Sequence, residues 1–305
     1  MNKHRSTSPV LIAALWMLGM VASLSTIAIA ARELSSQISP FEMIFFRCVF
    51  GLSVLTPLVL YQHGRIPLSS RMWNHVIRNI SHYCGQAAWF IGIGYLALGK
   101  VFALEFTTPM WTLLLAYLIL GEKITRWRAL SLALGLIGML LVLRPGMVPI
   151  HFASFVVIAS AFCFALSHIF TRKLAQVETP TLILFHMSLI QIVISAVPAL
   201  LNWTNPEGIA WLWLGLMGVA SITAHYSLSR ALALADASIM IPIDFLRLPM
   251  IILVGYIFYA ESLDLFVVLG ATIIFTGNFL NVRQEHQQHQ RDAAAASEEK
   301  NSPAT

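Results

Sequence analysis

The sequence contains very little charge. Only 11% of its 305 residues are Asp, Glu, Lys or Arg, while 58% are hydrophobic and the mean hydropathy is +0.76. Soluble globular domains carry about 25% charged residues, so this composition excludes a soluble globular protein. Most of the chain is expected to be surrounded by lipid rather than by water.

The sequence also lacks the features of a disulfide-stabilised protein and of a β-barrel. Its three cysteines, Cys48, Cys84 and Cys163, fall inside apolar stretches, where they serve as small buried side chains. The apolar stretches are long and do not alternate with a period of two, which excludes barrel strands. Helices satisfy their own backbone hydrogen bonds and are therefore the expected membrane-spanning elements.

Motifs for ATP hydrolysis, nucleophilic catalysis and metal-dependent hydrolysis are missing. The chain has no complete GxxxxGK[ST], GxSxG or HExxH string. His168 and His186 fall in separate apolar stretches without a cluster of ligands nearby, so the sequence predicts no metal site and no cofactor. An intramembrane enzyme is one alternative class of function, and a channel is another; saturable flux and counterflow would separate a channel from a carrier.

Apolar stretches of about 20 residues, the length that a helix needs to cross a bilayer, make up most of the chain. Pro, Gly and charged residues separate them, and they predict an all-α integral membrane protein with ten transmembrane helices. The expected spans are residues 9–31, 40–61, 76–97, 101–120, 127–143, 152–171, 180–201, 209–230, 238–259 and 264–282.

Lys and Arg are concentrated on one side of these spans. If the N-terminus is cytoplasmic, fourteen of them lie on the inner side and only Arg32, Lys100 and Arg144 on the outer side. The positive-inside rule then predicts that both termini face the cytoplasm. This placement also explains the net charge of +5 without nucleic-acid binding. A cleaved signal peptide ending near Ala30 is an alternative for the first stretch.

The two halves of the chain resemble each other at an offset of 139 residues. Glu105 then coincides with Asp244, Glu122 with Glu261, and Gly138 with Gly277. Each half has five expected helices, so the second half enters the membrane with the opposite orientation, as in many secondary transporters. We expect a first repeat at 1–146, an inverted second repeat at 147–283, and a disordered cytoplasmic tail at 284–305, which is polar and aperiodic. Duplication as a folding convenience is the alternative.

Four strings resemble the EamA family of the drug/metabolite transporter superfamily, and the resemblance covers residues 10 to 282. They are SPFEMIFFRCVFG (39–51), ALEFTTPMWTLLLAYLILGEKITRWRALSLALGLIGMLLVLRPG (103–146), PIDFLRLPMIILVGYIFYAESLD (242–264) and LGATIIFTGNF (269–279). The resemblance implies a bacterial inner-membrane carrier with a central cavity lined by the first, third, fourth, sixth, eighth and ninth helices. We expect a small organic solute as partner and, without an ATP-binding motif, a proton or an exchanged solute as the driving species; a homodimer is one option for the assembly.

Charged residues inside the expected spans are the main candidates for the solute site, because each one costs about 3 kcal/mol near the bilayer centre unless it faces a cavity or a partner. Glu105 and Asp244 are equivalent in the two repeats and would bind a cationic group; their mutual repulsion would also favour proton coupling. The alternative is neutralisation by an arginine, since Arg247 lies one turn after Asp244. Arg47 could bind a solute carboxylate or stabilise the fold, and Glu42 is assigned to gating or structure.

A second candidate set is polar and aromatic. His82, Gln86 and Trp89 are spaced by four and three residues and so share one helical face, while His225 and Tyr226 lie in the opposite repeat. Gln86 and His225 are equivalent at the same offset. These side chains would suit a flat or cationic solute; ordinary buried histidines are the alternative.

Five further residues are predicted to act in gating or structure. Glu122 and Glu261 fall at helix ends beside loops on opposite sides of the membrane, where capping or gating is expected. Pro109, Pro242 and Pro249 interrupt the fourth and ninth spans, since proline cannot complete the helical hydrogen-bond pattern.

Together these features predict a secondary transporter. Both charge signs in the candidate site favour a zwitterionic, amino-acid-derived solute, such as S-adenosylmethionine or an amino-carboxylate metal chelator, moved inward or outward. Riboflavin is the competing solute, because it needs aromatic stacking more than charge.

Overall fold

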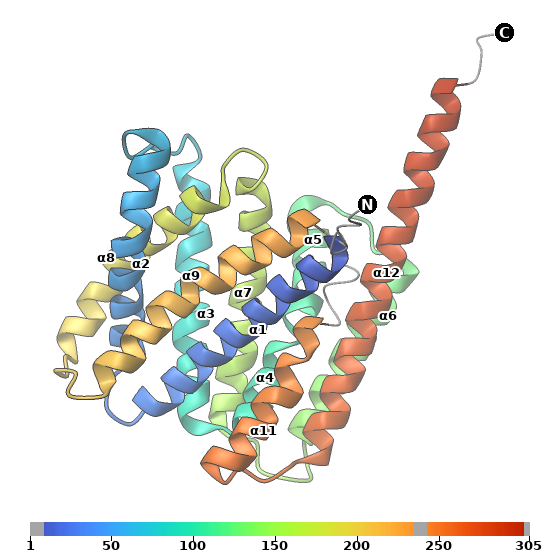
Figure 1. Ribbon diagram of the computed structural model, residues 1–305. Coiled ribbons are helices and arrows are strands. Elements are labelled where there is room, and N and C mark those ends of the chain that lie inside the picture. Colours follow the sequence, from blue (N-terminus) through green and yellow to red (C-terminus); the bar gives the residue numbers. More distant parts are fainter. Residues whose placement is uncertain (1–8, 235–242, 302–305) are drawn as a thin grey trace, which may run out of the picture.

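The computed structural model describes residues 9–234 and 243–301, and all regular elements in these ranges are helices packed side by side (Figure 1). The helices are α1 (Pro9–Leu34), α2 (Pro40–His63), α3 (Met72–Tyr95), α4 (Leu98–Glu105), α5 (Thr108–Leu120), α6 (Arg126–Leu143), α7 (Phe152–Leu174), α8 (Pro180–Leu201), α9 (Ala210–Leu234), α11 (Arg247–Tyr259) and α12 (Leu265–Asn301).

Seven segments of the described chain are long and apolar enough to cross a membrane, so the chain is a multi-pass membrane protein. They are α1, α2, α4 together with α5, α6, α7, α8 and the first part of α12. The helices α3 and α9 have 24 and 25 residues, also enough for a crossing, but they contain more polar residues.

The span expected at 101–120 is interrupted. Its helix stops at Glu105 and restarts at Thr108, because Pro109 has no N–H to donate to the carbonyl of Glu105 four residues earlier. The hydroxyl of Thr108 donates to that carbonyl instead, at 2.6 Å. The span expected at 238–259 is described from residue 243, and α11 begins at Arg247. Pro242 lies outside the described residues.

The local structure of α5 and of α11 coincides at the offset of 139 residues. Three pairs of positions correspond: the helix starts Thr108 and Arg247, the helix ends Leu120 and Tyr259, and the left-handed caps Gly121 and Ala260. The next amides, of Glu122 and Glu261, donate to the carbonyls of Ala116 and Gly255, six residues earlier. Both helices thus end with the same six-to-one hydrogen bond.

The helices pack in pairs drawn from the two halves of the chain. α1 packs against α9, α3 against α7, α2 against α8, and α6 against α12; α4 packs against α11. One large apolar core cluster joins α1, α2, α3, α4, α6, α7, α9, α11 and α12. The cluster includes the fully buried side chains of Phe90, Phe102 and Leu214.

The polar segment after residue 283 is helical as far as Asn301, whereas its composition predicts disorder. Ala, Gln, Glu and Lys are good helix formers, so they continue the helix that the preceding span has already nucleated. The end of α12 extends beyond the other helices (Figure 1).

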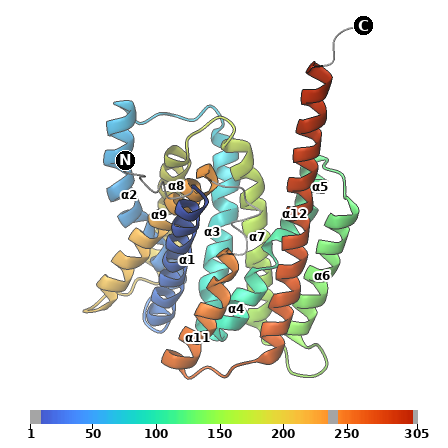
Figure 2. The ribbon, with the colours of Figure 1, turned by 45° about the vertical axis from the view of Figure 1, so that its right-hand side comes forward.

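Two glycines let α6 and α12 approach closely, and the two helices lie side by side in Figure 2. A Cβ atom on Gly138 would lie 2.5 Å from the carbonyl oxygen of Gly270, and one on Gly270 would lie 2.6 Å from the carbonyl oxygen of Gly138. Small residues at such crossings allow backbone contact between membrane helices.

We expect Gly138→Ala and Gly270→Ala each to destabilise the protein by about 1 to 3 kcal/mol, because the added methyl group meets backbone that cannot move aside. Gly215→Ala in α9 is the matched control, since nothing lies within 4 Å of its Cβ position. The melting temperature in detergent measures the effect. Equal melting temperatures for all three variants would contradict the close contact.

Candidate functional site

A cavity of about 580 Å³ lies between the helices and has the size of a small-molecule site. Residues of α1, α3, α4, α5, α7, α9, α11 and α12 line it, together with one residue of α2. Its lining includes Ile27 of α1, Trp89 of α3, Leu232 of α9 and Glu285 of α12. The lining therefore includes the helices that the family resemblance implies.

Eight of the nine predicted solute-binding residues line this cavity. They are Arg47, His82, Gln86, Trp89, Glu105, His225, Asp244 and Arg247. The ninth, Tyr226, does not: its side chain is 54% exposed and packs edge-on against Trp16 outside the cavity. Successive residues on a helix point about 100° apart, so the inward orientation of His225 turns Tyr226 away.

Arg247 lies between the two carboxylates. Its Nη1 atom is 3.2 Å from Oε1 of Glu105, and its Nε atom is 3.6 Å from Oδ1 of Asp244. The indole N–H of Trp89 donates to Oε2 of Glu105 at 2.8 Å. One cation is therefore shared by two anions. Arg247, Glu105 and Asp244 together carry a net charge of −1 when both carboxylates are ionised.

The helix interruptions position this charged group. Glu105 is the last residue of α4 and Arg247 the first of α11, so both side chains extend from places where a helix stops or starts. The guanidinium group of Arg247 lies 5.1 Å from the ring centre of Phe102 and 5.2 Å from that of Phe106. The two aromatic rings add a cation–π attraction to the contacts of Arg247 with the carboxylates.

Arg47 forms a second polar group. Its Nη1 atom donates to the hydroxyl of Ser221 at 3.0 Å, and its Nη2 atom donates to Oε1 of Gln191. The side-chain amide of Gln191 lies 3.0 Å from Nδ1 of His82. Arg47 is thus connected to α3, α8 and α9, and it still borders the cavity.

Sequence reasoning missed several polar residues of this site. Gln191 is completely buried in α8, and Asn278 of α12 donates to the carbonyl of Phe106 at 3.3 Å. Ser221 and Thr108 also border the cavity. Single neutral polar residues in an apolar helix give no periodic signal, so only the three-dimensional arrangement identifies them.

The residues assigned to gating or structure lie mostly outside the cavity. Glu42 is fully buried and accepts a hydrogen bond from the backbone N–H of Thr204 at 3.3 Å, so it fixes the linker between α8 and α9. Pro109 borders the cavity at the start of α5. Pro249 is the third residue of α11, where a missing N–H leaves no gap in the helix.

Glu122 and Glu261 lie in the linkers that follow α5 and α11. Glu122 contacts Arg172 at 2.6 Å and Arg128 at 2.8 Å, while Glu261 contacts Arg32 at 2.7 Å. Burial alone would raise the pKa of Glu122, but its two arginine partners outweigh burial and lower it. Burial raises the pKa of Glu261 despite Arg32.

Comparison with known proteins identifies related transporters. The model of the EamA-like transporter family matches residues 11–144 and again residues 151–283. The S-adenosylmethionine uptake transporter of Rickettsia felis is 26% identical over 277 residues, covering 90% of this chain and 94% of that protein.

Riboflavin transporters are similar as well. The one from Rhizobium johnstonii is 28% identical over 222 residues, or 72% of this chain and 74% of that protein. The one from Vibrio cholerae is 26% identical over 86% of this chain and 89% of that protein. A protein crystal structure with 16% identity superposes with a TM-score of 0.64 over 90% of this chain and 98% of that one, which shows a common fold.

Arg247→Met is expected to destabilise the protein by about 3 to 5 kcal/mol, because it leaves two carboxylates without a cation. The double variant Arg247→Met/Glu105→Gln removes one of these charges and should recover part of the loss. Melting temperatures in detergent test this, with the exposed Arg283→Met of α12 as control. A double variant that is less stable than Arg247→Met would contradict the shared pairing.

Proposed function

Since the chain belongs to the EamA-like transporter family, we propose that it carries a zwitterionic, amino-acid-derived solute such as S-adenosylmethionine across the bacterial inner membrane. The family and the transporter relatives indicate a transporter of a small solute rather than an enzyme. The proposal for the solute class rests on one observation, which is that Arg247 contacts both Glu105 and Asp244.

The excess of negative charge around Arg247 suits a cationic group. Asp244 is 32% exposed, and its one ion pair among the described residues is the 3.6 Å contact with Arg247. Its carboxylate therefore has lone pairs left for an amino or sulfonium group. Arg47, on α2, supplies the opposite charge for a solute carboxylate. Trp89 and Phe106 give the flat surfaces against which an adenine ring stacks.

Riboflavin is the second candidate solute. It has no cationic group, so it would use the aromatic faces rather than Glu105 and Asp244. The riboflavin transporters among the relatives support it, and the solute experiment below separates it from an amino-bearing compound.

For the architecture, we propose ten membrane crossings in two inverted repeats, residues 1–146 and 147–283. Seven of the crossings are the apolar segments named above, and the other three are α3, α9 and the span that contains α11. The packing supports this: exchanging the halves converts the α1 and α9 pair into the α7 and α3 pair, while α2 with α8 and α6 with α12 map onto themselves. Such a repeat permits alternating access to one central site.

We assign the positively charged helix ends, and with them both termini, to the cytoplasm. The cavity reaches Glu285 near that side, whereas α4 and α11 pack together at its other end. This arrangement corresponds to a carrier open to the cytoplasm.

Glu122 and Glu261 act as structural ties in this proposal. Arg172 and Arg32 end equivalent helices, α7 and α1, so the Arg172 to Glu122 and Arg32 to Glu261 pairs are related by the repeat. Both pairs are formed in one structure that is open to one side. Because these two pairs lie on opposite sides of the membrane in this proposal and both are formed, neither one distinguishes an inward-open carrier from an outward-open one.

S-adenosylmethionine is expected to raise the melting temperature of the detergent-purified protein, because a ligand that binds only the folded state at 100 times its Kd adds about 2.7 kcal/mol of stability. Glu105→Gln and Asp244→Asn should abolish this shift. Tyr226→Phe should retain it, since that side chain lies outside the cavity.

A shift with riboflavin that survives in Glu105→Gln and Asp244→Asn would overturn the amino-bearing solute and favour the flavin. Counterflow in proteoliposomes then tests the carrier mechanism. Flux that does not saturate and shows no counterflow would indicate a channel.

A further inference from the structure

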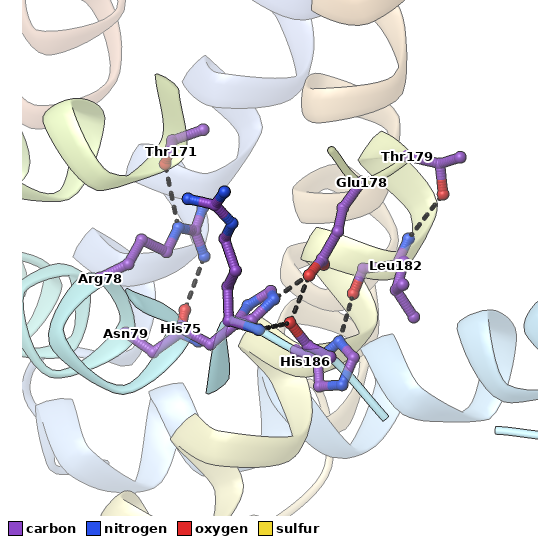
Figure 3. A network of polar contacts seen from close by, with 10 residues as sticks. His75, Arg78, Asn79, Thr171, Glu178, Thr179, Leu182 and His186 are labelled. Atoms are coloured by element: carbon purple, nitrogen blue, oxygen red, sulfur yellow. Dashed lines mark hydrogen bonds and ion pairs between the residues drawn. The ribbon is translucent and has the colours of Figure 1, made fainter. Parts of the chain in front are cut away.

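A cluster of three metal-ligating side chains lies outside the cavity, where α3, the linker between α7 and α8, and α8 meet. His75 belongs to the first turn of α3, Glu178 to the linker, and His186 to α8 (Figure 3). His75 is fully buried, and His186 is 2% exposed. None of the three borders the cavity.

The ligand atoms are close enough to share one ion. Nε2 of His75 is 2.8 Å from Oε2 of Glu178, the two imidazole ring centres are 4.5 Å apart, and one ligand atom from each residue lies within 4.8 Å of the others. Tetrahedral Zn²⁺ with bonds of about 2.0 to 2.1 Å separates its ligands by about 3.4 Å. Small side-chain movements therefore bring all three into coordination.

The surrounding hydrogen bonds prepare two of the ligands. Nδ1 of His186 lies 2.9 Å from the carbonyl oxygen of Leu182, which only accepts, so Nδ1 carries the proton and Nε2 keeps its lone pair. Oε1 of Glu178 accepts a hydrogen bond from the hydroxyl of Ser69. A histidine whose other nitrogen donates to a backbone carbonyl is typical of metal sites.

The nearest cation on α3 does not occupy the site. Arg78 lies one turn after His75, and its Nε atom donates to the hydroxyl of Thr171 at 3.1 Å while its Nη1 atom donates to Asn79 at 2.7 Å. Figure 3 shows the guanidinium group of Arg78 turned toward these partners.

We propose that His75, Glu178 and His186 bind a divalent transition-metal ion, with Zn²⁺ as the best match to two imidazoles and one carboxylate. Water or another ligand completes the coordination. Because His75 comes from the first half of the chain and the other two ligands from the second, the ion links the two halves at the ends of their helices. The site is independent of the proposed solute.

Co²⁺ serves as the probe, because its visible absorption reports nitrogen and oxygen coordination. The full-length protein, purified without a polyhistidine tag, is titrated with Co²⁺ in detergent and then with Zn²⁺. We expect one Co²⁺ per chain, displaced by Zn²⁺, and a Kd at least about tenfold higher in His186→Gln and Glu178→Gln.

His186→Gln is the decisive variant, because it leaves the contact between His75 and Glu178 in place and should fold as the wild type does. His63→Gln, at the exposed end of α2, and the tail variant His286→Gln/His289→Gln are controls that should keep the wild-type Kd. Zn²⁺ should also raise the melting temperature of the wild type but not of His186→Gln.

Co²⁺ binding that is unchanged in His186→Gln would overturn the proposal, and so would binding that disappears in the tail variant. A wild type that binds no Co²⁺ would also overturn it and would leave the cluster with a simple hydrogen bond between His75 and Glu178. None of these results bears on transport of the solute, so the two proposals fail separately.

Discussion

The requirement that buried charge be paired governs the centre of this protein. A carboxylate in an apolar environment costs several kcal/mol unless a cation and hydrogen-bond donors accompany it. Arg247 meets this requirement for Glu105 and Asp244 together, and Trp89 adds a donor for Glu105. The surrounding helices must therefore hold α4 and α11 in contact, because Glu105 ends one and Arg247 begins the other.

The cavity is bordered by two polar groups of different charge, one around Arg247 and one around Arg47. Near Arg247 the carboxylates outnumber the cation. Arg47 has the hydroxyl of Ser221 and the amide of Gln191 as partners, and within residues 9–234 and 243–301 it has no carboxylate partner. A solute with opposite charges at its two ends therefore has one preferred orientation, while a neutral flat molecule has to rely on stacking.

Much of this architecture can be predicted from the sequence, because long apolar stretches and the offset of 139 residues are strong, periodic signals. They predict the helices and bring Glu105, Asp244 and Arg247 to one place. Contacts between residues far apart in sequence give no such signal: His75 and Glu178 are separated by 103 positions, and the sequence predicts no metal site there. The composition of the segment beyond residue 283 predicts disorder, but composition does not register the preceding helix, which α12 continues as far as Asn301. Tyr226 directly follows His225, but adjacent residues on a helix do not share a face, so Tyr226 lies outside the cavity that His225 lines.

The interruption at Phe106 and Thr107 has a mechanical consequence. An unbroken helix resists bending because every turn is fastened by backbone hydrogen bonds, but here Pro109 removes one of them and the hydroxyl of Thr108 replaces it. A side-chain rotation can release this substitute without unwinding either helix. The joint between α4 and α5 is therefore a hinge of low stiffness, and α5 can tilt while α4 stays packed against α11. The carbonyl of Glu105 accepts the bond that replaces the missing one, so this joint lies directly beside the carboxylate that pairs with Arg247.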